Sequence, residues 1–243
     1  MTTNANLSNN AWYLAIKNND INHIGFFLSW GGKLKDNPYE LPATADSNKN
    51  FIYQDGSIWT PLLVAVKYCG EIEQKLYGGY GSSAFWTLIN YGNPDLNKKG
   101  KPLLDKPEQN PISYFLLLYE SLTTSPQTLF EMLLKHGANL TEGYKAYIAS
   151  GGSPNHIIKH GGHKKDSSTS LLWLAIHFND MEAVKFLINN GVDVNLSIEP
   201  YGAGSSQKDY WSHMRGSHTP LYFAMQQEDT SIADLLIEHG ARV

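Results

Sequence analysis

One interval recurs along this 243-residue chain and constrains the fold more than any other feature. A small residue in a short apolar run is followed sixteen residues later by a glycine that closes a second apolar run. Ala175 and Gly191 form the clearest pair, and Ala224 and Gly240 repeat it near the carboxyl end. The runs have helical spacing, and a glycine after the second run favours the left-handed conformation that ends a helix. Helices this short cannot bury their own apolar faces, so the interval predicts a stack of similar helix pairs.

Copies of this pair are recognisable at residues 9–34, 59–97, 110–140, 169–195 and 219–243. The last two are the most regular, and the last opens on Thr-Pro-Leu at 219–221. The copies at 9–34 and 110–140 are degenerate. Asn10 stands where the threonine belongs in the first, and Phe115 replaces the small alanine in the other. This pattern resembles the ankyrin repeat family, whose unit opens on Thr-Pro-Leu-His-x-Ala and closes on a glycine hairpin. The resemblance implies an all-α ankyrin-repeat solenoid of helix-turn-helix units, forming a single domain over residues 1–243.

Long segments separate the copies where the family has short hairpins. They are expected as finger-loop insertions at residues 35–58, 98–109, 141–168 and 196–218. Insertions in a solenoid gather on one face, which is often the binding face. Residues 97–109 and 141–168 each carry four lysines against two acidic residues. This excess favours an acidic surface on a protein partner, although charge that merely solvates the loops is the alternative.

Composition excludes several classes of protein. With 42% hydrophobic and 17% charged residues the chain is expected to fold, and a net charge of −4 argues against a nucleic-acid binder. Residues 1–10 do not resemble a signal peptide, and no apolar run is long enough for membrane insertion. Cys69 is the single cysteine, so a reducing, cytoplasmic compartment is expected. The oligomeric state is left open.

Two groups of residues are candidates for contact with a partner. The first follows the small residue of each first helix, where ankyrin domains in general line a concave groove: Lys17, Lys67, Tyr68, His177, Phe178 and Gln226. The second comprises aromatic residues of the insertions, because tyrosine and tryptophan are common interface anchors: Tyr144, Tyr147, Tyr201, Tyr210 and Trp211. The alternative for the second group is that each insertion buries its own aromatic rings on the solenoid.

No residue set supports catalysis, a cofactor or a metal. His156, His160 and His163 are close in sequence, but Gly161-Gly162 interrupts any helix there and no cysteine or paired carboxylate completes a site. Cys69 shows no activating base in the sequence. The resemblance also implies that Asn195 is a candidate for asparagine hydroxylation, since it ends a Val-Asp-Val-Asn hairpin. Its main expected role is to hydrogen-bond that same hairpin.

The sequence therefore predicts a protein-protein interaction module that binds through the groove and the finger insertions. Its degenerate repeats resemble ankyrin proteins that intracellular bacteria deliver into host cells, which implies a host protein as partner and the host cytosol as location. Two alternatives stay open at this point. One is an enzyme whose site the insertions build over the groove, and the other is an adaptor for a catalytic domain beyond Val243.

Overall fold

The computed structural model describes residues 10–30, 48, 50–73, 84–118, 121–122, 126–160, 168–199 and 218–243. The chain divides by its internal contacts into two compact units. The N-terminal unit comprises residues 1–118 and 132–139, and the C-terminal unit comprises residues 119–131 and 140–243.

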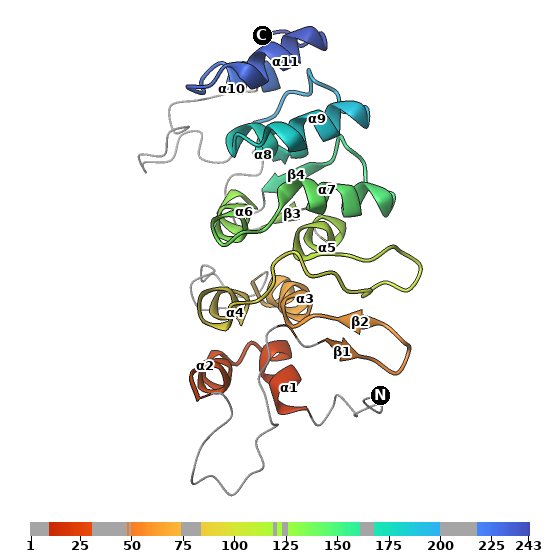
Figure 1. Cartoon of the computed structure of the whole chain (residues 1–243), viewed down its shortest axis with the longest axis vertical. Coiled ribbons are helices and arrows are strands. Elements are labelled where there is room, and N and C mark those ends of the chain that lie inside the picture. The colour runs from red at the N-terminus through yellow and green to blue at the C-terminus, as the bar shows by residue number, and fades with distance from the viewer. Residues whose placement is uncertain are drawn as a thin grey trace, which may run out of the picture. The chain divides into compact units, whose positions relative to one another are not determined.

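Short helices build the N-terminal unit in alternating order. Its first helices are α1 (Ala11–Lys17), α3 (Pro61–Glu73) and α5 (Pro111–Leu118). Its second helices are α2 (Ile21–Trp30) and α4 (Ala84–Gly92), and α6 (Pro126–Lys135) is divided between the two units. Helix α3 packs between α1 and α5, while α2 packs on α4 (Figure 1). This is the predicted stacking of like helix on like helix.

The C-terminal unit continues the same order. Its first helices are α8 (Leu171–His177) and α10 (Pro220–Ala224), and its second helices are α9 (Met181–Asn189) and α11 (Ser231–Glu238). Helix α8 packs on both α9 and α10, and α10 packs on α11. The mostly helical repeat fold predicted from the sequence is confirmed.

A polar cap explains why each first helix begins where it does. The residues before the first helices each accept a hydrogen bond from the backbone N–H three positions later: Asn10, Thr60, Asn110, Ser170 and Thr219. Such caps satisfy a backbone donor that the first turn leaves unpaired. Asn10 therefore does in the degenerate first copy what threonine does in the regular one.

One predicted insertion differs from expectation. In place of an irregular loop at 141–168, the structure has helix α7 (Leu140–Ala149) followed by strands. Helix α7 packs on α9, so it takes the place of a second helix in the C-terminal unit. Leu140, Tyr144 and Tyr147 recur at helical spacing and are buried, which gives α7 an apolar face.

Small sheets occupy other parts of the predicted insertions. Strand β1 (Phe51–Ile52) pairs antiparallel with β2 (Ile58–Trp59), with Phe51 opposite Trp59. In the C-terminal unit the sheet order is β3 (Ser121–Leu122), β4 (Ile157–His160) and β5 (Ser168–Ser170). Strand β4 runs parallel to β3 and antiparallel to β5.

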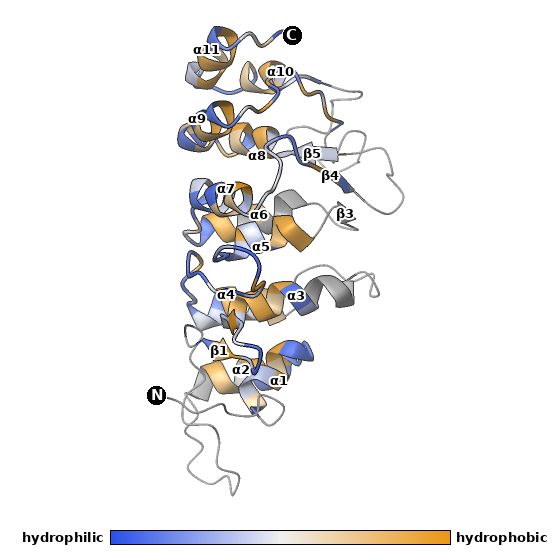
Figure 2. Cartoon of the chain, turned by 90° about the vertical axis from the view of Figure 1, so that its right-hand side faces the viewer, coloured by the Kyte–Doolittle hydropathy of each residue, from blue (hydrophilic) through white to orange (hydrophobic). Residues whose placement is uncertain are grey.

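Apolar side chains between the helices form the core of each unit. The small landmark residues Ala65, Ala175 and Ala224 are fully buried, because the helices approach closely there. Phe115 takes the corresponding place in α5 and is buried as well. The hydrophilic face of α9 points away from α8 (Figure 2), as expected for a second helix with one solvent-facing side.

Candidate functional site

The carboxyl ends of the first helices present half-buried side chains in both units. Lys17 closes α1, and Lys67 and Tyr68 lie in the second half of α3. In the C-terminal unit His177 and Phe178 end α8 and are half-buried, while Gln226 follows α10 and is exposed. The six predicted groove residues thus lie in the second half of a first helix or just after it.

Aromatic rings hold the two lysines of the N-terminal unit. The Lys17 ammonium lies 5.9 Å from the ring centre of Tyr13 and 5.7 Å from that of Tyr68. The Lys67 ammonium lies 4.8 Å from the ring centre of Trp59 and 5.2 Å from that of Tyr68. These distances are within the range of cation–π attraction. We call Lys17, Lys67, Tyr13, Trp59 and Tyr68 the lysine–aromatic cluster.

Stacked rings shape the corresponding surface of the C-terminal unit. The His177 ring stacks on Trp173 with centres 4.9 Å apart and an angle of 8° between the planes. Phe178 meets His177 edge to face, with centres 4.8 Å apart. Because the indole of Trp173 is buried, it anchors a short row of rings that reaches the surface at Phe178.

The prediction that Tyr144 and Tyr147 are exposed anchors is wrong. Their side chains are 0% and 4% exposed, because α7 turns both rings into the core against its neighbours. The Tyr144 hydroxyl donates to the backbone oxygen of Leu171 at 2.9 Å, which satisfies its polar end. The alternative expectation, that an insertion buries its own aromatic rings, holds for Tyr144 and Tyr147. Tyr201, Tyr210 and Trp211 lie outside the described residues.

We call the segment that follows each second helix a finger. Asparagine side chains join one finger to the next. Asn195 Nδ2 donates to the Gly240 oxygen at 3.2 Å, and its Oδ1 accepts from the Arg242 N–H at 2.8 Å. Its own hairpin contributes one bond, from the Asn195 N–H to Asp193. The expected role of Asn195 is therefore corrected: its side chain bonds the next finger and not its own. Its hydroxylation stays a prediction.

The same bonds occur at three asparagines that the sequence reasoning missed. Asn155 Oδ1 accepts from the Asp193 N–H at 2.6 Å, and Asn97 Oδ1 accepts from the Asn139 N–H at 2.7 Å. Asn48 does likewise for the Asp95 N–H. Their spacing from a turn residue could have indicated three of these asparagines. Asn97, Asn155 and Asn195 each stand four residues after a residue with positive φ, namely Asn93, Gly151 and Gly191.

Of the three clustered histidines, only His156 has a described side chain. His156 is half-buried against Tyr147, with ring centres 5.6 Å apart. His160 is the last residue of β4, but its side chain is not described. His163 and the side chain of Cys69 are not described either. Among the described residues no group of three or more His, Cys, Asp and Glu side chains is arranged to hold a metal ion. Nor does the described part contain a helix long and apolar enough to cross a membrane.

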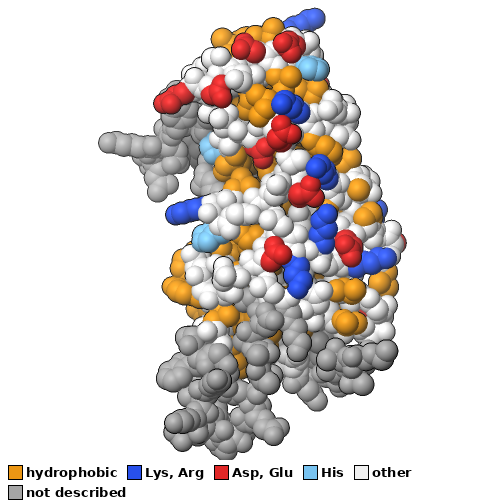
Figure 3. All heavy atoms as spheres, viewed as in Figure 1, with side chains coloured by type: hydrophobic (Ala, Val, Ile, Leu, Met, Phe, Trp, Pro, Cys, Tyr) orange, Lys and Arg blue, Asp and Glu red, His pale blue; other side chains and the backbone are white. Residues whose placement is uncertain are grey.

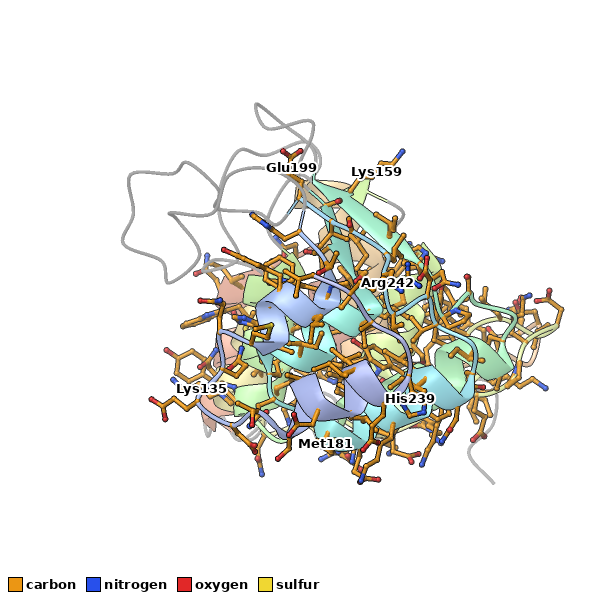
Figure 4. The ribbon with its side chains drawn as sticks, turned by 90° about the horizontal axis from the view of Figure 1, so that it is seen from above. Lys135, Lys159, Met181, Glu199, His239 and Arg242 are labelled. Carbon is orange, nitrogen blue, oxygen red and sulfur yellow. The ribbon has the colours of Figure 1, made fainter. Side chains whose placement is uncertain are left out.

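The outer faces of the second helices have a different character. Basic and acidic side chains are interspersed over α7 and α9 (Figure 3), where Lys145 pairs with Glu142 and Lys185 with Glu182. Exposed pairs of this kind contribute little to stability and mainly solvate a surface. Seen from above, Met181 lies on this helical side of the C-terminal unit and Lys159 on the opposite side with β4 (Figure 4). The rings described above therefore set the first-helix ends apart from a generic charged surface.

Comparison with known proteins follows the same repeats. The family model for ankyrin repeats, in three copies, matches residues 126–243. A search among curated proteins found no significant match. The matched range begins with α6 and includes the regular pairs α8–α9 and α10–α11. Residues 126–243 therefore belong to the ankyrin repeat family.

Proposed function

We propose that this chain is a protein-binding module whose partner contacts the carboxyl ends of the first helices. Ankyrin repeats in general mediate protein-protein interaction, and repeat solenoids offer extended surfaces for it. The observation that carries the proposal is Phe178. It ends α8 with a half-buried ring, although only its backbone N–H is needed to close the helix. Half-exposed rings packed on a buried aromatic base are typical of residues that dominate binding energy.

The lysine-bearing loop at 98–109 supports a partner with an acidic patch. This loop is fixed by backbone bridges from Gly100 to Gln109 and from Ile58 to Lys101. A fixed basic loop attracts an acidic surface without the cost of ordering the loop on binding. We propose that this loop extends the surface formed by the helix ends of the N-terminal unit.

The resemblance to translocated bacterial ankyrin proteins extends the proposal to a host protein as partner. The physical requirement is the same for any cytosolic partner, namely an apolar pocket that receives the Phe178 ring. A eukaryotic lysate is therefore the source of candidate partners for the capture experiment.

Affinity capture with two matched variants tests the proposal. Phe178→Ala removes the half-buried ring at the helix end, whereas Tyr91→Ala removes a ring that is 67% exposed on second helix α4. We expect the wild type and Tyr91→Ala to retain the same protein, and Phe178→Ala to retain at least about tenfold less, as for an interface hot spot.

Thermal unfolding of each variant supplies the control. We expect Phe178→Ala to melt close to the wild type, so that its loss of binding reflects the surface. Equal retention by all three proteins would contradict the proposal, and a large fall in the melting temperature of Phe178→Ala would assign that ring to the core.

A further inference from the structure

The finger after α7 carries a serine where two other fingers carry an aspartate. This finger connects α7 with β4 in the C-terminal unit (Figure 1). In three fingers of the described chain, the second residue after the one with positive φ holds the same place: Asp95, Ser153 and Asp193. A side-chain oxygen of each accepts the backbone N–H of the asparagine two positions later, at 2.9 Å for both aspartates and 3.1 Å for the serine. Ser153 is therefore the neutral member of a set whose other two members are carboxylates.

The Ser153 hydroxyl is open in a way that other hydroxyls beside proline are not. Thr60 and Thr219 also precede prolines, but the hydroxyl of each caps a helix by accepting the N–H three positions later. Thr60 is buried and Thr219 is half-buried. Ser153 precedes Pro154 and is exposed. Ser125 precedes a proline as well, but it lies outside the described residues.

The backbone at Ser153 lacks a hydrogen bond that the same place has in other fingers. Four residues at this place donate their N–H to the asparagine side chain of another finger: Asp95, Asn139, Asp193 and Arg242. No described residue accepts the Ser153 N–H, and Pro154 has no N–H to donate. A tip with fewer backbone bonds opens at lower cost, and exposed tips of small polar residues are readily taken up by enzymes. Gly151 and Gly152, which come just before Ser153, add to this freedom.

We propose that Ser153 is a phosphorylation site for a protein kinase that selects serine followed by proline. In this step the Ser153 Oγ forms a bond to the γ-phosphorus of ATP, the bond from that phosphorus to the β–γ bridging oxygen breaks, and ADP leaves. The hydroxyl proton passes to a base of the kinase. Pro154 supports recognition because it fixes its own backbone and keeps Ser153 out of a helical conformation. The inference does not depend on the partner surface proposed at the first-helix ends.

The finger has a place for the negative charge that phosphorylation adds. In two other fingers a carboxylate already accepts the N–H that corresponds to that of Asn155. A phosphate on Ser153 offers anionic oxygens to the same N–H, and charge-assisted hydrogen bonds are stronger than neutral ones. We therefore expect the phosphorylated finger to keep the bond between the Asn155 amide oxygen and the Asp193 N–H.

Phosphorylation of the full chain in vitro tests the proposal. The protein is incubated with ATP and a proline-directed serine/threonine kinase, and mass spectrometry locates each phosphate. We expect phosphate at Ser153 in the wild type, and its loss in Ser153→Ala and in Pro154→Ala. Ser197→Ala is the matched control and should keep the phosphate at Ser153, because Ser197 is an exposed serine that no proline follows. A synthetic peptide of residues 147–160 shows whether the kinase accepts the segment by itself.

Ser153→Asp tests whether the finger accepts an anion at this place. We expect this variant to melt close to the wild type and to retain slow hydrogen exchange at the Asn155 N–H, because aspartate makes the same bond in two other fingers. Ser153→Ala removes the acceptor, so exchange of the Asn155 N–H should become faster.

Phosphate on the peptide but not on the folded chain would overturn the proposal, because the finger would then be closed to the kinase. Absence of phosphate from both, or phosphate confined to Ser125, Thr60 or Thr219, would overturn it as well. A large fall in the melting temperature of Ser153→Asp would contradict a place for an anion in this finger.

Discussion

Single side chains link neighbouring repeats inside each unit. In the C-terminal unit, Asn155 and Asn195 each place an amide between their own finger and the next, where one amide satisfies both a backbone N–H and a backbone oxygen. The N-terminal unit uses Asn97 in the same way. A side-chain amide suits this place because it offers an N–H donor and an oxygen acceptor on separate atoms without charge.

Removing one amide should lower stability measurably. We expect Asn195→Ala to reduce the free energy of unfolding by about 1 kcal/mol, because two backbone groups lose a protein partner and turn to water. Chemical denaturation measures this change. Asn189→Ala, an exposed asparagine at the end of α9, is the control and should change stability little. The two variants behaving alike would contradict a linking role for Asn195.

The buried phenol of Tyr144 gives a prediction that depends on pH. Burial raises the pKa of Tyr144 well above its ordinary value of about 10. A group with a raised folded-state pKa contributes stability below its unfolded pKa, and that stability is lost as the pH rises further.

Tyr144→Phe should cost about 1 kcal/mol at neutral pH through the lost bond to Leu171. Above about pH 10 its stability relative to the wild type should recover, since phenylalanine does not ionise. Urea denaturation at several pH values follows this difference. A Phe variant as stable as the wild type at neutral pH would contradict it.

At the scale of elements, α7 is the main departure from a regular repeat. The chain passes from Gly137 directly into α7, and Thr141 in its first turn stands four residues after that glycine. An asparagine stands at this spacing in the regular fingers. Helix α7 ends at Ala149, and the positive φ of Gly151 just after it matches that of Gly191 after α9. It therefore closes like a second helix, although no first helix directly precedes it in the C-terminal unit's described residues.

Close packing behind α7 leaves no room for a side chain at Gly152 unless Tyr147 moves. A β-carbon at this position would lie 2.3 Å to 2.5 Å from ring atoms of Tyr147, which is itself buried. We expect Gly152→Ala to destabilise the protein by about 1 to 3 kcal/mol, as overpacking does. Gly25→Ala in α2 is the contrast, because the added carbon meets open space there and alanine favours helix. Melting temperatures should fall for the first variant and rise slightly for the second.

At the scale of the whole molecule, contacts concentrate within two units of the chain. Stability in repeat proteins is approximately a sum of the repeats and the interfaces between neighbours. A defect in one repeat should therefore be felt most in the helices that pack directly on it.

Hydrogen exchange can measure how far a core defect extends. Leu174→Ala opens a cavity in α8 at a fully buried site, with an expected cost of about 2 to 5 kcal/mol. Backbone amides of α8 to α11 should lose protection, while those of α1 to α4 change much less. Leu63→Ala in α3 should give the reverse pattern. Uniform loss of protection along the chain in both variants would show a single cooperative body instead.

Local signals determined much of this protein in advance. Helix pairs, polar caps and glycine turns depend on residues within a few positions of one another, so the regular copies at 169–195 and 219–243 were predicted with their family. The places of Lys17 and Phe178 at the ends of first helices followed from the same register.

Tertiary structure decided the rest, because long-range packing leaves little trace in sequence. The glycine within α7 makes its sequence resemble a loop. The apolar face of α7 is stabilised only where α9 packs on it. The burial of Tyr144 follows from that packing. The asparagine links and the placement of Lys67 over Trp59 each join residues brought together by stacking of the repeats. The periodic sequence by itself determined the regular helix pairs. Only packing decided that α7 forms, which side chains face each other and which reach the surface.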